Sequence, residues 1–269
     1  MLTRRAALLT PLALASGGAT AATGKMNLSL HQYTSAGAGY QRSLEGWAKA
    51  GIRFVEPAAN LLDEYLKTES MASAKRVLTD NGLIVVSGAI GTTGLWEPNP
   101  KFAENLEAFK KRCAQFVELG APVVYSPCAT SAKFTVDDYA RGVDNIRQVA
   151  EVARQFGLKV GAEFVRNSTY MASLPTALRL CRAAAHPSFG VLFDCYHFWS
   201  GPSKFEDLDQ IRPGEIVHAH LNDTQDLPRE LLDQQSRVIA GDGVAPLPRI
   251  LRKLVDKGYA RKLVDKGYA

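Results

Sequence analysis

The chain has 269 residues, of which 46% are hydrophobic and 22% are charged, so it can form one large globular domain or two small ones with an ample core. Its formal net charge of +5 at pH 7 includes +2 from Arg4 and Arg5 and +2 from the second copy of a duplicated C-terminal segment. Subtracting both leaves +1 and no concentrated basic stripe, which argues against a nucleic acid partner.

The first residues, MLTRRAALLTPLALASGGATAATG, have the pattern of an export signal. The arginine pair precedes an apolar run from Ala6 to Ala15, and small residues follow as far as Ala21. This pattern predicts a twin-arginine signal peptide over residues 1–22, and therefore export to the periplasm. A short amphipathic helix fits less well, because the run is rich in small residues that pack poorly. No other segment is long and apolar enough to span a membrane.

Seven short apolar runs alternate with longer helical patterns after this segment. The runs predict strands at 27–33, 52–57, 83–90, 122–127, 158–164, 189–198 and 215–223. The helical patterns at 100–120 and 135–157 each end on glycine, the residue that best ends a helix. Strands and helices that alternate in this way predict parallel strands with right-handed crossovers, and seven such units predict a single (β/α)8 TIM barrel over residues 26–260. An open doubly wound sheet is the weaker alternative, because TSAGAGYQRS after the first strand contains no GxGxxG.

The C-terminus departs from a complete barrel. RKLVDKGYA at 252–260 is repeated letter for letter at 261–269. The first copy reads as the end of the seventh helix, so the sequence predicts that strand eight and its helix are missing. Such a short tandem is not a structural repeat. We interpret it as a truncation or assembly fault, with a second helical segment covering the open seam as the alternative.

Polar residues collect at the predicted carboxyl-terminal ends of three consecutive strands. Side chains alternate along a strand, which places Glu163, Asp194 and His220 at the same rim, where barrel enzymes carry their chemistry. Carboxylate and imidazole ligands suit one divalent ion such as Mn²⁺, Co²⁺, Zn²⁺ or Mg²⁺. Each residue alone is better interpreted as a hydrogen-bonded barrel residue than as a ligand, but the three together favour a metal or catalytic site.

The motifs GAEF, FDCYH and HAHLND resemble the metal-binding strand ends of the xylose isomerase-like barrels, specifically the sugar phosphate isomerase/epimerase group. The resemblance covers essentially the whole chain after the signal. It implies that Glu163, Asp194 and His220 bind one metal ion and that His197 contacts substrate. The family's fourth ligand, a glutamate on strand eight that also serves as an acid/base group, has no counterpart in this sequence.

The resemblance further implies a metal-dependent isomerase or epimerase, with Glu163 and His197 as catalytic residues. The reaction is proton abstraction beside a carbonyl through an enediolate, with Glu163 as both ligand and base. The alternatives are a dehydratase of a hydroxy-ketone and a non-catalytic sugar-binding barrel. An apurinic endonuclease is disfavoured, because Arg237 stands where that branch has a metal-binding histidine. Because an exported enzyme meets few phosphorylated sugars, the expected substrate is a free sugar, a keto-sugar or a polyol derivative. The oligomeric state is left open.

Five further residues are candidates for substrate contacts. For each, an ordinary role in packing, in hydrogen bonding or at the solvated rim is at least as good an interpretation. They are His31, Glu56, Trp96, Arg166 and Trp199. His218 is expected to support His220 from below rather than to bind a metal.

Overall fold

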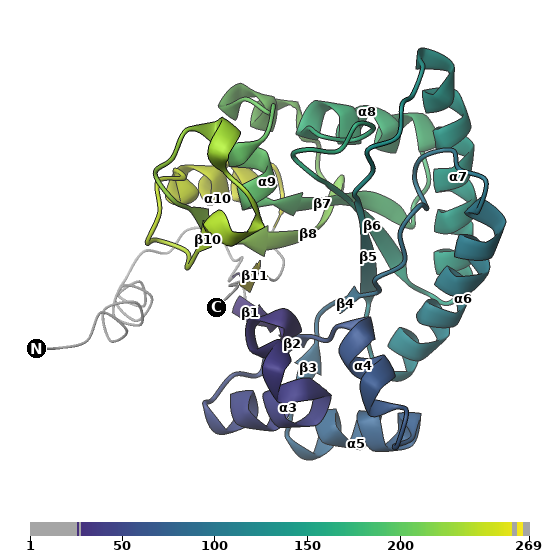
Figure 1. The fold of residues 1–269 in the computed structure, drawn as a ribbon, viewed down its shortest axis with the longest axis vertical. Coiled ribbons are helices and arrows are strands. Elements are labelled where there is room, and N and C mark those ends of the chain that lie inside the picture. Colours follow the sequence, from purple (N-terminus) through teal and green to yellow (C-terminus); the bar gives the residue numbers. More distant parts are fainter. Residues whose placement is uncertain (1–25, 27, 260–262, 266–269) are drawn as a thin grey trace, which may run out of the picture.

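Short parallel strands form a curled sheet in the computed structural model, which describes residues 26, 28–259 and 263–265 (Figure 1). The hydrogen-bonded order is β3-β2-β1-β11-β8-β7-β6-β5-β4. A parallel bridge connects Ala58, two residues after β2, with Ala89 of β4 at the other end of the sheet. The strands are β1 Leu28–His31, β2 Phe54–Glu56, β3 Ile84–Val85, β4 Gly88–Ala89, β5 Val123–Cys128, β6 Lys159–Phe164, β7 Phe189–Asp194, β8 Ile216–Leu221 and β11 Leu263–Asp265. Strands β1 to β8 lie at the seven strand positions that the sequence predicts, with β3 and β4 sharing the third, and β11 lies at the eighth position of a (β/α)8 barrel, where the sequence predicts no strand.

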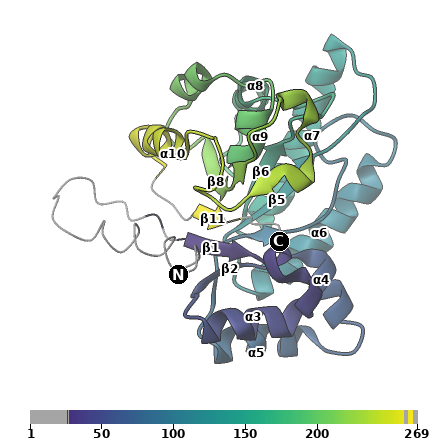
Figure 2. The same cartoon turned by 60° about the vertical axis from the view of Figure 1, so that its left-hand side comes forward.

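Helices cover the outside of this sheet (Figures 1 and 2). They are α3 Gly39–Lys49, α4 Ala59–Tyr65, α5 Met71–Asp80, α6 Phe102–Glu118, α7 Val136–Gln155, α8 Leu174–Ala184, α9 Cys195–Ser200 and α10 Leu247–Asp256. Local chemistry sets several of their ends. Asp138 accepts hydrogen bonds from the amide and hydroxyl of Thr135 at the start of α7. The glycines predicted to end two helices, Gly120 after α6 and Gly157 after α7, both have positive φ values, of 87° and 70°.

The third barrel strand is divided. The sequence predicts one strand over 83–90, but β3 pairs only with β2, and β4 pairs with β5. Between them, the side chain of Ser87 turns into the barrel and donates a hydrogen bond to Glu56. The break therefore lies where the strand contributes a polar group to the barrel interior.

The duplicated segment adopts two structures. Leu254, Val255 and Asp256 of the first copy form the last turn of α10, whereas the same three letters of the second copy form β11. This strand pairs in parallel with β1 on one side and β8 on the other, where the sequence predicts no strand (Figure 2). An open barrel would leave the edges of β1 and β8 unpaired, and pairing them outweighs the weak helix preference of the segment. No described residue follows β11, so the barrel has no described eighth helix.

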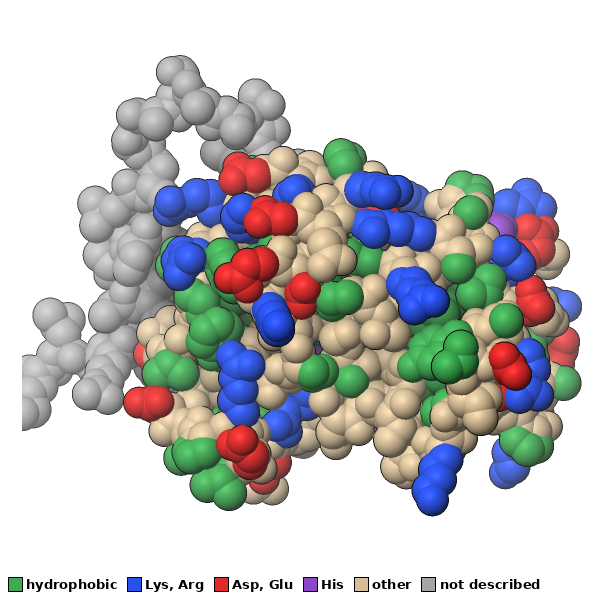
Figure 3. All heavy atoms as spheres, turned by 90° about the horizontal axis from the view of Figure 1, so that it is seen from above, with side chains coloured by type: hydrophobic (Ala, Val, Ile, Leu, Met, Phe, Trp, Pro, Cys, Tyr) green, Lys and Arg blue, Asp and Glu red, His purple; other side chains and the backbone are tan. Residues whose placement is uncertain are grey.

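The described part of the surface shown in Figure 3 has no concentrated patch of positive charge. Lys and Arg side chains are scattered among acidic and uncharged ones on the face drawn in Figure 3. Within the described part of the chain, no helix has the length and hydropathy needed to cross a bilayer. The predicted signal peptide lies outside the described residues.

Candidate active site

Four buried polar side chains converge inside the barrel near the carboxyl-terminal ends of their strands. Glu56 ends β2, Asp194 ends β7, and Glu163 and His220 each lie one residue before the end of β6 and β8. Asp194 and His220 are direct partners in the ladder between β7 and β8. None of the four is more than 1% exposed. The structure therefore brings the three predicted metal ligands together and adds Glu56 to them.

Glu163, Asp194 and His220 have the geometry of ligands around one ion. Nδ1 of His220 lies 3.1 Å from Oε1 of Glu163 and 3.6 Å from Oδ2 of Asp194. Two ligand atoms bound tetrahedrally to one zinc-sized ion are about 3.4 Å apart, as bond lengths near 2.1 Å require. Ligand atoms of the three residues all lie within 4.8 Å of one another. Two carboxylates and an imidazole therefore fit a divalent cation in both chemistry and spacing.

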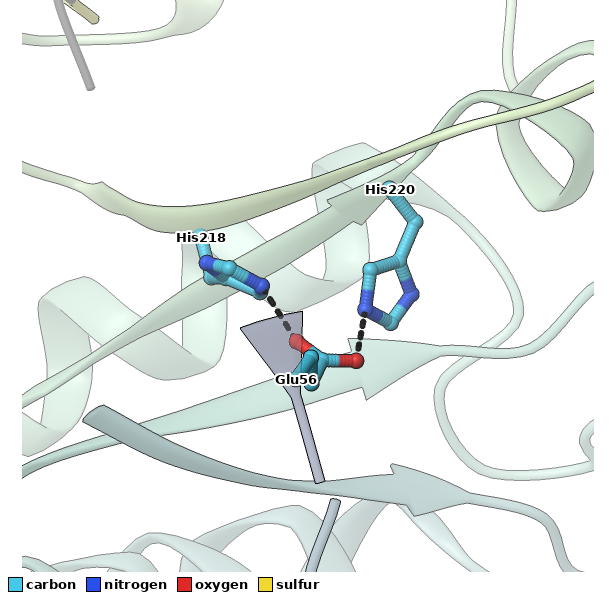
Figure 4. A group of neighbouring side chains, drawn as sticks. All are labelled: Glu56, His218 and His220. Atoms are coloured by element: carbon cyan, nitrogen blue, oxygen red, sulfur yellow. Dashed lines mark hydrogen bonds and ion pairs between the residues drawn. The ribbon is translucent and has the colours of Figure 1, made fainter. Parts of the chain in front are cut away.

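Glu56 lies on the other side of His220 and contacts two histidines of β8 (Figure 4). Its Oε1 is 3.2 Å from Nε2 of His220, and its Oε2 is 2.6 Å from Nε2 of His218. Ser87 also donates to Oε2. Burial raises the pKa of Glu56, but His220 and His218 together lower that pKa well below its usual range. Burial lowers the pKa of His218, more than the Glu56 carboxylate raises it. Hydrogen bonds from Ser87 and from the histidines thus favour the carboxylate form of Glu56.

Asp194 is held from three directions. Its Oδ1 accepts a hydrogen bond of 2.8 Å from the amide of His197, which makes Asp194 the N-cap of α9. Nη1 of Arg237 lies 3.3 Å from Oδ1 and 3.2 Å from Oδ2, and Asn222 donates to Oδ2 at 3.3 Å. The same cap starts α9 immediately after β7, where the sequence predicts a strand as far as residue 198. His197 consequently lies in the first turn of a helix, three residues after Asp194.

A cavity of about 210 Å³ opens on this cluster. Glu163, His197, Gln234 and Arg237 supply its polar lining. Nη2 of Arg237 lies 3.1 Å from Nε2 of His197, so these two side chains form one polar wall. The rest of the lining is mainly apolar or aromatic and comes from Tyr33, Ala89, Ile90, Gly91, Tyr125, Pro127, Ala129 and Val165. A carboxylate opposite hydrogen-bond donors, beside a cation site, can move a proton at a carbon while holding neighbouring oxygens.

A model of the xylose isomerase-like TIM barrel family matches residues 44–264. The chain belongs to this family. An inosose isomerase of Halalkalibacterium halodurans is 27% identical over 225 residues, which are 81% of this chain and 79% of the relative. A 3-dehydroshikimate dehydratase of Pseudomonas putida is 25% identical over 230 residues, 80% of this chain and 34% of the relative. Among solved structures, the IOLI protein with a bound zinc atom has a TM-score of 0.82 and 22% identity, covering 90% of this chain and 89% of that one.

The other predicted substrate contacts of this xylose isomerase-like barrel lie away from the cavity lining. His31 is completely buried, with Nε2 at 3.0 Å from the hydroxyl of Tyr125. Trp96 is equally buried and donates to the carbonyl of Ser126. The guanidinium of Arg166 donates to the carbonyls of Ser200, Leu232 and Arg229, and thereby ties loops together. The guanidinium of Arg229 lies over the ring of Trp199, with Cζ of Arg229 at 5.1 Å from the ring centroid.

Three residues of the site are not among the predicted ones. The sequence marks Arg237 only as a difference from a related branch of the family. Its position beside Asp194 could not be predicted, because Arg237 follows β8 by a long connection whose path has no readable pattern. Tyr125 lies within an apolar run, and its hydroxyl reaches His31 inside the barrel. Asn222 could have been predicted to lie at the site, because it stands in the motif HAHLND directly after β8.

The backbone of β11 pairs at the level of the cluster. Val264 of β11 is the ladder partner of His220 on one side and of Ser29 on the other. The sequence has no glutamate after Glu230, so the strand-eight glutamate that the resemblance implies has no counterpart in β11.

Proposed function

We propose that this protein is a divalent-metal-dependent isomerase or epimerase of a sugar-like hydroxy-ketone. The observation that carries the proposal is the convergence of Glu163, Asp194 and His220 on one another, with Glu163 also lining the cavity. Family membership supports the same conclusion, and so does the inosose isomerase that matches most of the chain.

The side chains of the cavity have separate roles in this proposal. Glu163 takes the proton from the carbon beside the substrate carbonyl, because it is the carboxylate among the described lining residues. His197 and Arg237 face the same space and hold substrate oxygens. A divalent ion bound by Glu163, Asp194 and His220 supplies positive charge where negative charge develops on the substrate. The apolar walls exclude water from the reacting carbon.

The cavity favours an uncharged substrate. Arg237 is the one Lys or Arg among the described residues that line it, and that guanidinium already faces the carboxylate of Asp194. A phosphate would need further positive charge here. Aromatic and aliphatic walls beside a few polar groups suit the faces of a ketose or a cyclic polyol ketone. The twin-arginine pattern also favours an uncharged substrate. We expect the enzyme to work in the periplasm, where few sugars are phosphorylated.

Solvent deuterium exchange tests the proposal directly. The protein loaded with Mn²⁺ is incubated in D2O with an inosose or a free ketose, and incorporation at the carbon beside the carbonyl is followed by mass spectrometry. We expect exchange in the parent protein and a loss of at least 100-fold in Glu163→Gln. Binding without exchange would indicate a sugar-binding barrel. Absorbance from a new conjugated double bond would indicate water loss, as the name of the dehydratase relative suggests for that protein.

Metal content provides a second test of the site. We expect Asp194→Ala to lose the bound ion in native mass spectrometry, because it removes one of three ligands. Asp144→Ala is a suitable control, since Asp144 lies on the exposed face of α7 and pairs with Arg147. An unchanged ion content in Asp194→Ala would refute the assignment.

A further inference from the structure

A second group of potential ligands shares His220 with the first. Ligand atoms of Glu56, His218 and His220 also lie within 4.8 Å of one another (Figure 4). Each group uses a different nitrogen of the His220 ring, because Nδ1 lies next to Glu163 and Nε2 lies next to Glu56. The two groups therefore have to be assigned separate roles.

The distances within the second group, which we call the inner group, are those of hydrogen bonds. Oε2 of Glu56 and Nε2 of His218 are 2.6 Å apart, shorter than the roughly 3.4 Å between two ligands of one zinc-sized ion. Ser87 occupies the same carboxylate oxygen. In addition, Glu163 of the first group lines the cavity, whereas neither Glu56 nor His218 does. An ion bound there would have neither room between its ligands nor contact with substrate.

The protonation of His220 follows from this assignment. A metal binds the lone pair of a neutral imidazole, and the nitrogen nearest Glu163 and Asp194 is Nδ1. The proton of the neutral ring then resides on Nε2, where the acceptor is Oε1 of Glu56 at 3.2 Å. A buried carboxylate in that position fixes both the tautomer and the orientation of the ring.

We propose that Glu56 is a positioning residue that holds Nε2–H of His220 and so presents Nδ1 as the ligand atom for the metal. His218 and Ser87 fix Glu56 in turn, because both contact its second oxygen. His31 adds support, since its Nε2 lies 3.4 Å from Oε1 of Glu56. The proposal rests on the proposed metal site but not on the reaction, and it assigns Glu56 no contact with substrate.

Nitrogen-15 spectroscopy of the histidines in the zinc-loaded protein tests the proposal without a mutation. We expect His220 to bind zinc through Nδ1 and to carry a proton on Nε2. Zinc on Nε2, or an Nε2 without a proton, would overturn the proposal. Neither result bears on whether the enzyme catalyses proton exchange.

Zinc affinity measured by competition with a chelator separates the two groups. We expect Glu56→Gln to weaken binding about 10- to 100-fold and Asp194→Asn to abolish it. Glu97→Gln is the matched control, because Glu97 is also a buried carboxylate but contacts Cys128 outside the cluster; its affinity should stay within about twofold of the parent. Unchanged affinity in Glu56→Gln would refute the positioning role. Loss of zinc in Glu56→Gln with retention in Asp194→Asn would place the ion in the inner group, and would also overturn the proposal.

Discussion

The guanidinium of Arg237 lies within 3.3 Å of both carboxylate oxygens of Asp194, one of the three proposed metal ligands. Both side chains are almost completely buried, at 1% and 0% exposure. A protein cation thus faces the carboxylate that is also placed to bind a metal ion. The metal-free state is stabilised by this pair, since an uncompensated buried carboxylate is costly.

Arg237→Met is therefore expected to destabilise the metal-free protein strongly, by about 3 to 5 kcal/mol, because it leaves Asp194 without its cationic partner. Zinc should recover much of the loss, so thermal scans should show a larger rise in Tm on adding zinc to the variant than to the parent. Arg141→Met changes an exposed arginine on α7 and is the control. An equal zinc-induced rise in both proteins would contradict the idea that the guanidinium compensates the site's charge.

The sequence predicts the barrel and its three candidate ligands for a simple physical reason. Alternation along a strand has a fixed period of two, so Glu163, Asp194 and His220 can be assigned to the interior without knowing the fold in detail. Contacts made by loops have no such period. The approach of Arg237 to Asp194 depends on the path of the connection after β8, and that path is decided by tertiary packing.

Two local errors have different causes. The predicted strand over 189–198 is too long because apolar residues continue past Asp194, although aspartate is a preferred N-cap and a helix start could have been recognised there. The duplicated segment could not have been assigned from its letters. Leu254–Asp256 and Leu263–Asp265 are identical in sequence, but the first copy continues the helix that begins at Leu247, whereas the second pairs with β1 and β8.

Gly190 in β7 is expected to tolerate no side chain. A Cβ there would lie 2.3 Å from Cγ1 of Val217 and 2.9 Å from the carbonyl oxygen of Glu215. Because the Glu215 carbonyl belongs to the backbone and the other methyl of Val217 would lie 3.1 Å away, Gly190→Ala should lower the free energy of unfolding by about 1 to 3 kcal/mol. Gly161→Ala in β6 is the matched control, since its Cβ would approach no atom closer than 3.3 Å. Equal losses in urea denaturation of the two variants would contradict the explanation.

The ion pair of Arg182 and Glu215 should make stability depend on pH. Nε of Arg182 donates to Oε1 of Glu215 at 2.7 Å, and the amide of Arg212 donates to Oε2 at 2.9 Å. Burial raises the pKa of Glu215, but the hydrogen bonds from Arg182 and Arg212 lower it by more than burial raises it. The pKa of Glu215 therefore lies below its usual value. A lowered pKa in the folded state means that the stabilisation is present above the unfolded pKa of about 4.3 and is lost as pH falls through the folded value.

Glu215→Gln is accordingly expected to cost about 1 to 2 kcal/mol of unfolding free energy at pH 7 and progressively less at acid pH. Urea denaturation of parent and variant between pH 7 and pH 3 gives the difference at each pH, so that other titrating groups largely cancel. Glu104→Gln, at an exposed carboxylate on α6, should change stability little at any pH. A cost for Glu215→Gln that stays constant with pH would show that the charge of Glu215 is not responsible.

The pairing of β11 with both β1 and β8 predicts that the duplicated tail stabilises the barrel. Val264 lies in register between Ser29 and His220, and a proline cannot be accommodated in a strand with neighbours on both sides. Val264→Pro should therefore lower the free energy of unfolding by about 2 to 3 kcal/mol, whereas Val264→Ile should have little effect. Hydrogen exchange provides the local measurement, since amides of Leu28–His31 and Ile216–Leu221 should lose protection in the proline variant alone. If both variants keep the parent's stability and protection, the tail does not close the barrel in solution.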